Sequence, residues 1–265
     1  MPLAPRAQGA LRLAAKRRGR ETVIKELRQE GSLKALFPRV RGDALDAVFL
    51  NTAGGLTGGD RMDIRVAAGE GAHVVMSSQA AERAYRAHPG QIAKSTVSLD
   101  VAAGGRVDWV PQETILFQCA ALARSTTVHL QADATALLVE PVIFGRTAMG
   151  EVVHDVHLTD QWRVYRDDRL IFADAIRLIG DADELLARKA IAAGAGAMAT
   201  ILLAGSQAAA CAALIDLPDS SGASLIADDL LLVRLLATDG FTLRQQMIPV
   251  IEALSTAPLP RVWRL

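Results

Sequence analysis

Cysteine is nearly absent from this sequence, which contains only Cys119 and Cys211 among its 265 residues. Two cysteines far apart in the chain cannot form the disulfide framework of a small secreted protein, and they are typical of a reducing compartment. Neither cysteine has a histidine or a second cysteine close by in the sequence, so no structural zinc site is predicted.

Aromatic residues and long apolar runs are also scarce. Aromatic residues make up 4% of the chain and hydrophobic residues 51%, so small aliphatic side chains must fill the interior. Few rings are therefore available to stack on nucleic-acid bases. No apolar run reaches the roughly 18 residues of a membrane span, and basic residues interrupt positions 1–20, where a secretory signal needs a continuous apolar core. We expect a cytoplasmic protein with no membrane segment and no nucleic-acid partner.

A nucleotide-binding loop is missing, although the segment 51–60 (NTAGGLTGGD) is rich in glycine. A phosphate-binding loop needs Lys and then Ser or Thr after its last glycine, and here Asp60 and Arg61 follow. The segment predicts two tight turns between strands, or a backbone packed along an interface or a passage, because glycine permits positive φ and close approach. Its glycines are Gly54, Gly55, Gly58 and Gly59.

Catalytic and metal-binding motifs are missing as well, since the chain has neither G-x-S-x-G nor H-E-x-x-H. Glu140 and Asp168 can be drawn as an acid–base pair, but a chain with 29 carboxylates offers many such pairs. His154 and His157 lie in an alternating stretch, where residues three apart point to opposite faces of a strand. No chelating histidine pair is predicted.

Charge is balanced overall but unevenly distributed. Residues 1–41 hold 11 Lys and Arg against 3 Asp and Glu, so this segment carries +8 and the remainder carries −8. A basic arm on an acidic body suits a nucleic acid or an acidic partner protein, and the alternative is a solvated N-terminal edge.

What the sequence does contain is a strong period of two, which predicts half-buried strands. Apolar and polar residues alternate in the segments 61–66, 93–101, 126–131, 152–158 and 162–167. A weak repeat accompanies the alternation, because 66–74, 101–109 and 130–138 share one outline of strand, short turn and strand. We interpret these units as hairpins, stacked either in a solenoid or in a plain sandwich.

The pattern changes after about residue 180. The order of charges in 181–193 favours a helix, 198–204 is a buried strand, and 230–236 is ambiguous. Ser206 is a candidate N-cap for a helix, and 239–254 is helical with Pro249 kinking or splitting it. We predict one domain over 1–265, with a β-rich body at about 9–180 and a mixed α/β part at about 181–265.

Two further segments are candidates for contacts. Gln79, Tyr85 and Arg86 belong to the polar stretch 79–86, where Tyr and Arg suit a protein interface, the alternative being an exposed loop. Arg146 ends the segment 140–146 (EPVIFGR) and is expected to pair with a carboxylate, within the chain or across a contact.

Taken together, these segments resemble the UreD (UreH) family of urease accessory proteins. The resemblance rests on NTAGGLTGGDR at 51–61, SSQAAERAYR at 77–86, VPQE at 110–113, EPVIFGR at 140–146 and PRVWR at 260–264. It spans the chain from about Gly9 to Arg264. One departure is visible: the family usually has Thr-Thr, and often Lys, where this chain has Ser77, Ser78, Glu82 and Arg83.

The resemblance implies a β-helix-like body of two sheet layers with about two helices towards the C-terminus. It implies a non-enzymatic chaperone that binds the urease apoprotein and UreF, which recruits the GTPase UreG, so that nickel enters urease. It also implies an internal passage for nickel(II) in transit and no stably bound cofactor. Weak carboxylate ligands suit such a passage, and Asp60 and Glu140 lie inside matching motifs.

Two other functions remain open from the residues alone. One is a β-sandwich hydrolase or transferase that uses Glu140 and Asp168. The other is a stand-alone protein that stores nickel. The first requires turnover by the isolated chain, and the second requires tight, stoichiometric nickel binding without partners.

Overall fold

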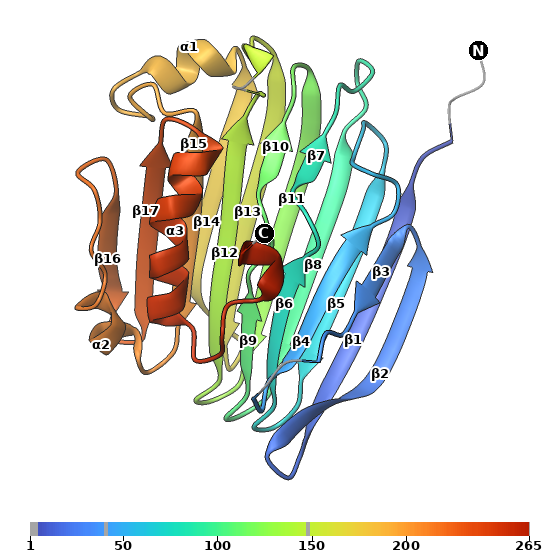
Figure 1. Cartoon of the computed structure of the whole chain (residues 1–265), viewed down its shortest axis with the longest axis vertical. Coiled ribbons are helices and arrows are strands. Elements are labelled where there is room, and N and C mark those ends of the chain that lie inside the picture. Colours follow the sequence, from blue (N-terminus) through green and yellow to red (C-terminus); the bar gives the residue numbers. More distant parts are fainter. Residues whose placement is uncertain (1–4, 40–41, 147–148, 265) are drawn as a thin grey trace.

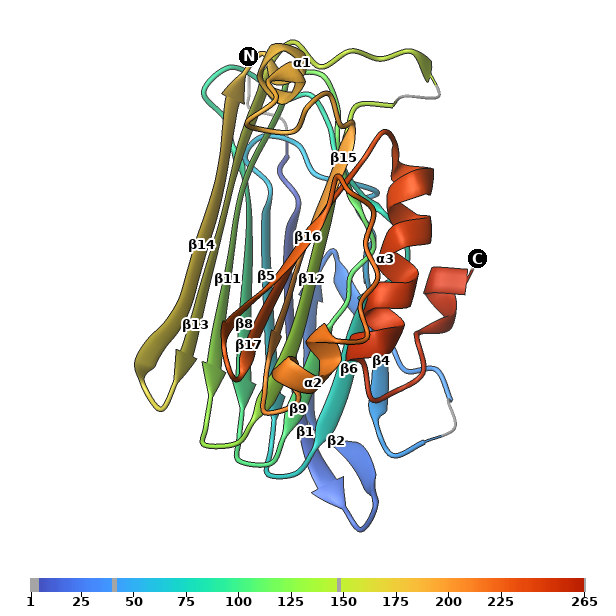
Figure 2. The same ribbon diagram turned by 90° about the vertical axis from the view of Figure 1, so that its left-hand side faces the viewer.

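The computed structural model describes residues 5–39, 42–146 and 149–264 and shows two β-sheets packed face to face (Figures 1 and 2). The mainly β fold confirms the expected class. It contains three α-helices rather than about two, and all three follow the β-rich body in the sequence.

The seven-stranded sheet consists mostly of parallel neighbours. Its order is β14-β13-β11-β8-β5-β1-β2, and only the two edge strands, β2 and β14, run antiparallel to the strand beside them. The strands are β1 (Gln8–Arg18), β2 (Glu21–Gly31), β5 (Arg61–Ala68), β8 (Ala93–Val101), β11 (Ala120–Leu130), β13 (Val156–Arg166) and β14 (Arg169–Gly180).

The ten-stranded sheet combines a parallel centre with antiparallel flanks. Its main order is β16-β17-β15-β12-β9-β6-β4-β3, and β10 and β7 join it beside β12. The strands are β3 (Leu33–Leu36), β4 (Leu45–Asn51), β6 (His73–Ser78), β7 (Glu82–Ala84), β9 (Arg106–Trp109), β10 (Thr114–Leu116), β12 (Thr135–Phe144), β15 (Ala197–Ala204), β16 (Gly222–Ala227) and β17 (Leu230–Ala237).

The three repeated units each connect one sheet to the other. Their turns lead from β5 to β6, from β8 to β9 and from β11 to β12, so the interpretation as hairpins was wrong and the stacked solenoid is confirmed. Successive turns stack by backbone hydrogen bonds, in which Ala102 N donates to Ala68 O and Gln131 N donates to Val101 O, both at 2.9 Å. In a hairpin the two strands pair with each other, whereas here each turn pairs with the turns of the neighbouring coils of the solenoid.

The predicted alternation positions the core. In β8, Val97, Leu99 and Val101 are buried between the sheets, while Lys94 and Asp100 face outward. The stretch 152–158 is strand only from Val156 onward, and it continues without a break into the stretch predicted at 162–167. One long strand therefore replaces two short ones.

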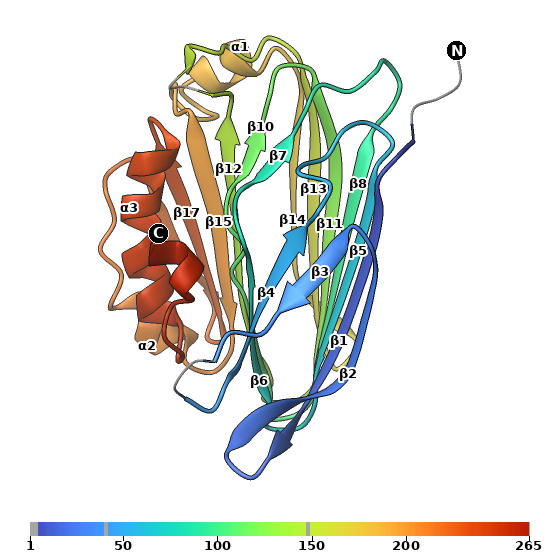
Figure 3. The same ribbon diagram turned by 45° about the vertical axis from the view of Figure 1, so that its right-hand side comes forward.

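The helices lie on the C-terminal part of the chain. They are α1 (Ala182–Ala187), α2 (Ala208–Ala212) and α3 (Gly240–Leu254), followed by a short 3-10 helix, η2 (Arg261–Arg264). α3 covers the outer face of the ten-stranded sheet (Figures 2 and 3). The strands β15 and β17, predicted as buried or ambiguous, extend the ten-stranded sheet next to β12.

Three helix predictions need correction. The helix expected over 181–193 ends at Ala187, although Asp181 caps it by accepting from Glu184 N. Ser206 is not a cap, because α2 begins after Gln207 with no side-chain cap bond. Pro249 does not split α3, whose buried residues Met247, Val250, Ile251 and Leu254 pack on the sheet. Burial of each of these side chains stabilises the fold by about 2 kcal/mol. Their sum exceeds the roughly 3 kcal/mol that a proline inside a helix costs.

Candidate functional site

The glycine-rich segment and the polar stretch that follows β6 pack against each other. Leu56 N donates to Arg83 O and Tyr85 N donates to Leu56 O, each at 2.7 Å. Gly55 has φ +149°, and a Cβ there would lie 2.7 Å from Arg83 O. The close pairing therefore requires glycine, so the segment is both a pair of turns and a packed backbone.

Asp60 closes the end of the same segment. Its carboxylate is buried and accepts from Ala7 N and Thr57 N, both at 2.8 Å. Gly58 is crowded by Gln91 O, which lies 2.6 Å from where a Cβ would be, and Gly59 has φ +92°. Both oxygens of Asp60 are thus engaged by backbone amides that fix the turn.

A cavity of about 200 Å³ lies between the two sheets beside this segment. Asn51, Gly54 and Gln79 line it at the loop end. Deeper in, the wall combines the apolar residues Phe49, Trp109 and Leu122 with the charged residues Arg124 and Glu140. The cavity is therefore an interior space with charged groups built into an apolar wall.

A half-buried carboxylate stands at the loop end of the cavity. Asn51 Nδ2 donates to Glu82 Oε2 at 3.3 Å and to Gly55 O at 3.0 Å, so one side chain ties Glu82 to the glycine segment. Burial raises the pKa of Glu82, and the bond from Asn51 partly offsets this rise.

A buried cluster of three charged residues occupies the inner end. Arg124 on β11 contacts Glu140 on β12 at 2.5 Å and Asp160 on β13 at 2.6 Å, and it donates to Thr114 at 3.1 Å. Trp109 Nε1 donates to Glu140 Oε1 at 2.9 Å. With both carboxylates ionised the cluster carries one net negative charge in a low-dielectric interior, which favours a proton or a cation.

Glu140 is a carboxylate whose pKa is strongly perturbed by its surroundings. Burial raises the pKa of Glu140 to about 7 and Asp160 adds to the rise, while Arg124 and Trp109 work in the opposite direction. The carboxyl group can therefore gain or lose a proton near neutral pH.

Polar residues continue from the cluster across the interior. In the strand register, Glu140 on β12 lies opposite Thr200 on β15, and Thr200 lies opposite Arg234 on β17. Arg234 spans the two sheets to reach Asp174 on β14 at 2.6 Å. These residues form a polar row, defined as Glu82, Arg124, Glu140, Asp160, Thr200, Arg234 and Asp174, that runs through an otherwise apolar core to the partly exposed Arg234–Asp174 pair.

Several buried atoms near this row lack a partner in the part of the chain that the structure describes. They are Arg124 Nε, Asp160 Oδ1 and the hydroxyls of Thr126 and Thr200. Buried polar atoms are nearly always satisfied, and an interior site of this kind is typically filled by water or an ion. The row is chemically suited to hold water.

The cavity wall coincides with an interruption of the ten-stranded sheet. β12 pairs with β9 over Thr135–Leu138 and with β10 over Val142–Phe144, so one side has no partner strand between them. Pro141 lies in this gap, where a residue without an N–H is tolerated inside a sheet. The neighbouring Glu140 faces the cavity at the same place.

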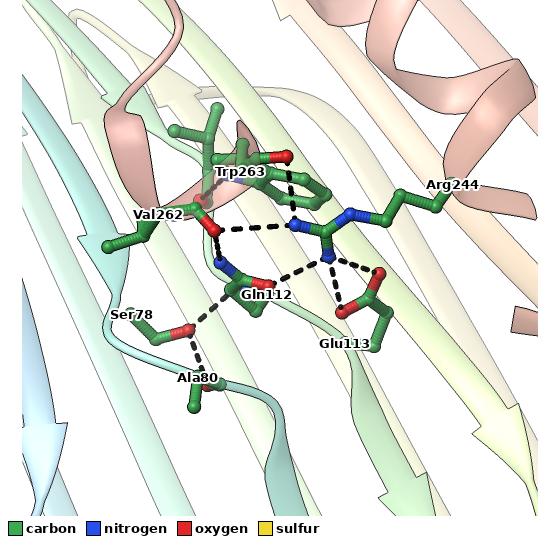
Figure 4. A network of polar contacts seen from close by, with 8 residues as sticks. Ser78, Ala80, Gln112, Glu113, Arg244, Val262 and Trp263 are labelled. Atoms are coloured by element: carbon green, nitrogen blue, oxygen red, sulfur yellow. Dashed lines mark hydrogen bonds and ion pairs between the residues drawn. The ribbon is translucent and has the colours of Figure 1, made fainter. Parts of the chain in front are cut away.

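The chain that bridges the gap is held from outside by the C-terminus (Figure 4). Arg244 on α3 donates to Gln112 at 2.8 Å, to Glu113 at 3.0 Å and to Trp263 O at 2.9 Å. Trp263 Nε1 donates to Val110 O at 3.0 Å, and the guanidinium lies 4.8 Å from the Trp263 ring centroid. The segments 110–113 and 260–264, remote in sequence, thus form one cover over the gap.

The exposed rim near the glycine segment is aromatic and basic. Tyr85 packs edge-on against Phe117, with ring centroids 5.0 Å apart. The guanidinium of Arg146 lies over the Phe117 ring, 4.7 Å from the ring centroid, and it pairs with Glu151 at 2.9 Å. The carboxylate partner expected for Arg146 is therefore within the chain. Arg86 and Gln79 are exposed on the same segment.

The structure separates the residues that the sequence placed together. Asp168 is exposed in the turn between β13 and β14, while Glu140 is buried in the middle of β12 with Arg124 and Asp160. The Glu140–Asp168 acid–base pair is therefore not formed. Of the two carboxylates predicted to line a passage, Glu140 lies on the cavity and Asp60 does not.

Several residues of the site were not predicted. Arg124 falls on the inward side of the alternation, between Leu122 and Thr126, and an inward arginine was the signal that could have revealed a buried ion cluster. Asp160 has the same signal on β13. Arg244 gave none, because its partners lie in segments far away in sequence.

Two absences among the described residues bear on function. Within 5–39, 42–146 and 149–264, no group of three or more His, Cys, Asp or Glu side chains is arranged to hold a metal ion. The same residues contain no helix long and apolar enough to cross a membrane.

Comparison with known proteins assigns the family. A family model described as UreD urease accessory protein matches residues 7–264. This chain belongs to the UreD family. Proteins named urease accessory protein UreD from Ruegeria sp. (strain TM1040), Roseobacter denitrificans and Rhizobium leguminosarum bv. viciae are 46%, 45% and 46% identical to it. Each alignment covers 98% of this chain and respectively 91%, 96% and 96% of the relative.

Membership confirms the resemblance seen in the sequence and gives the chain an accessory role in urease maturation. The motifs that carried the resemblance also meet in space. The segments 51–61 and 77–86 pack together at the loop end of the cavity, and 110–113 and 260–264 cover the gap beside Glu140.

Proposed function

We propose that this UreD protein is a chaperone that helps insert nickel(II) into apo-urease in the cytoplasm, in a complex with UreF and the GTPase UreG. Nickel passes through the chain as cargo and no cofactor stays bound. The chain itself catalyses no reaction and is not an enzyme. Family membership supports the role in urease maturation, and the polar row supports a path for the ion.

The single observation that carries the path is the row of charged and hydroxyl groups between two apolar sheets. Burying charge is costly, so an interior row of this kind needs a function or full pairing. Its ligands are carboxylates and hydroxyls, which hold a divalent transition metal less tightly than thiolates or imidazoles. Such ligands let the ion leave again, as a conduit requires.

Glu82 at the loop end and Glu140 with Asp160 inside are the carboxylates that would lead the ion inward. Arg124 repels a cation and forms ion pairs with both Glu140 and Asp160. Entry of Ni²⁺ therefore requires the guanidinium to give up these ion pairs. Asp60 keeps its two backbone bonds in this scheme and fixes the loop end.

The proposal is tested with a variant that removes all charge from the cluster. In R124Q/E140Q/D160N the two amides keep the shapes of the carboxylates, the guanidinium is replaced by a shorter neutral group, and no unpaired ion is left. The matched control is R28Q/E30Q/D63N, which neutralises exposed groups of similar type on β2 and β5.

Each variant is co-expressed with urease, UreF and UreG, and the nickel content of purified urease is measured. We expect the cluster variant to assemble normally but to yield urease with at least about tenfold less nickel, while the control yields fully loaded urease. Full loading by the cluster variant would remove the proposed path. Full loading in cells that lack this chain altogether would remove the proposed function.

The rival functions have weaker support. A hydrolase built on Glu140 and Asp168 lacks its pair, because the two side chains are not brought together. Stoichiometric storage of nickel needs a strong ligand set, and the described residues offer none with three clustered donors. Turnover of a small molecule by the purified chain would restore the first rival, and tight nickel binding without partners would restore the second.

A further inference from the structure

The hairpin of β1 and β2 extends beyond the rest of the seven-stranded sheet. β1 pairs with β5 only as far as Ala15, which lies opposite Ala68 at the end of β5. The hairpin continues to a turn at Gly19, and Figures 1, 2 and 3 show it as the lowest part of the molecule. We call residues 16–25 the hairpin tip.

The hairpin tip is strongly basic and largely unneutralised. It holds five basic residues and one acidic residue. Lys16, Arg18, Arg20 and Lys25 are exposed, and none of them has a carboxylate within 4 Å among the residues that the structure describes. Beyond residue 41 the chain carries a net charge of −8. The tip is therefore a positive projection from a negative body.

Hydrogen bonds from within the hairpin tip tie it to the body of the molecule. Thr22 N donates to Asp43 O at 2.8 Å, and Thr22 Oγ1 accepts from His73 N at 2.9 Å. Arg17 donates to Gly71 O at 2.9 Å and to Gly19 O at 3.0 Å, which ties the tip to the next turn of the solenoid. A charged surface held in one conformation loses little entropy when a partner binds.

The composition of the hairpin favours a protein partner over a nucleic acid. Ile24 and Leu27 are 39% and 36% exposed beside the basic residues, so apolar contact is available within a charged surface. β1 and β2 contain no aromatic residue to stack on a base. Glu21 and Glu26 on β2, together with the negative body, would repel a phosphate backbone.

We propose that the hairpin tip is a docking arm for an acidic, carboxylate-rich surface on a protein of the urease maturation assembly; the existence of that assembly rests on the proposed function. The tip lies at the opposite end of the sandwich from β7 and the loop end of the cavity (Figure 1). Binding at the tip therefore leaves the cavity free.

The test uses charge reversal in the tip against charge reversal elsewhere. The tip variant is R18E/R20E/K25E, and the control is R169E/R177E/K189E, which makes the same change in net charge at exposed positions of β14 and after α1. Wild type and both variants are purified with UreF. Their binding to immobilised apo-urease and UreG, one at a time, and the pull-down of UreF are measured at about 50 and 300 mM NaCl, between which screening increases strongly.

We expect one protein partner whose binding weakens at least about tenfold with salt. The tip variant should bind that partner at least about tenfold more weakly at low salt and lose the salt dependence, while the control stays within about twofold of wild type. Equal binding of all partners by the tip variant and the control would overturn the proposal. So would wild type binding a DNA duplex more tightly than any protein, or a self-association that only the tip variant loses.

The outcome is separable from the proposed function. Binding is measured without nickel, so a blocked passage does not affect it. If the tip variant binds normally and nickel loading still depends on the charged cluster, only the docking arm is wrong.

Discussion

The two sheets are wound from the same solenoid but differ in continuity. The seven-stranded sheet is unbroken, and five of its strands stack in parallel register with regular alternation of apolar and polar residues. The ten-stranded sheet is interrupted between β9 and β10, and there Glu140, the cavity and the C-terminal cover occur together. Regular pairing provides the frame, and a local break in pairing provides the site.

The largest effect is expected from a substitution in the buried cluster of Arg124, Glu140 and Asp160. Replacing Arg124 with Met leaves Glu140 and Asp160 buried without a counter-ion, and we expect a loss of about 3–5 kcal/mol in unfolding free energy. Arg177→Met on the outer face of β14 should change it by less than about 0.5 kcal/mol. Urea unfolding of the UreF-bound protein measures both. Equal small effects would mean that the cluster is solvated and not buried.

The second prediction concerns pH. The pKa of Glu140 in the fold is raised to about 7, above its ordinary value, so the folded state keeps a proton that the unfolded state releases. Unfolding free energy should therefore decrease as pH rises from about 4.5 to 7, by about 3 kcal/mol from this group. Glu140→Gln removes the contribution and should flatten the pH profile of thermal unfolding by that amount. Identical profiles for wild type and variant would contradict the assigned pKa.

The third prediction concerns the cover over the gap. Arg244→Ala removes the bonds to Glu113, Gln112 and Trp263 O and should cost about 2 kcal/mol, because Glu113 is buried and loses its charged partner. Arg188→Ala breaks an exposed pair between Glu184 on α1 and the residue that follows the helix, and it should cost less than about 0.5 kcal/mol. Limited proteolysis should also release the C-terminus of the Arg244 variant first. Uncut C-termini in both variants would show that the cover is held by other contacts.

The smallest effect is expected from replacing a glycine of the glycine-rich segment with alanine. Gly55→Ala should cost about 1–2 kcal/mol, because the added Cβ approaches Arg83 O in a backbone conformation with positive φ. Gly19→Ala, at φ +65°, meets nothing within 4 Å, so it reports the milder cost of a left-handed backbone without crowding. Thermal unfolding of both variants gives the difference. A cost at Gly55 no greater than at Gly19 would show that the segment relaxes.

Much of the fold was predictable because strand alternation is local. Val97, Leu99 and Val101 are spaced by two and lie on one face whatever the rest of the chain does. The repeat at 66–74 and 101–109 also predicted stacked units. Local pattern could not distinguish a hairpin from a turn between sheets, because both need the same short turn and differ only in which strand pairs beside them.

The candidate site was predicted only in part. Glu140 was identified through the motif that carries the family resemblance, and a packed backbone was one of the two interpretations of the glycine segment. Asp60 was assigned a role on the cavity that its two backbone bonds do not support. The outcome of Pro249 was also beyond local rules, since burial of its helix against the sheet outweighs the cost of one missing hydrogen bond.

By itself, the sequence determined the alternation of the strands, the repeated units, the uneven charge and the family resemblance, because each is a property of short segments or of their order. Only the tertiary structure decided that Arg124 meets Glu140 and Asp160, and that Arg244 joins 110–113 to 260–264. Ion pairs between sheets depend on how far one strand slides past another and on which side chains share a layer. Those quantities are set by packing of the whole core, which no single segment contains.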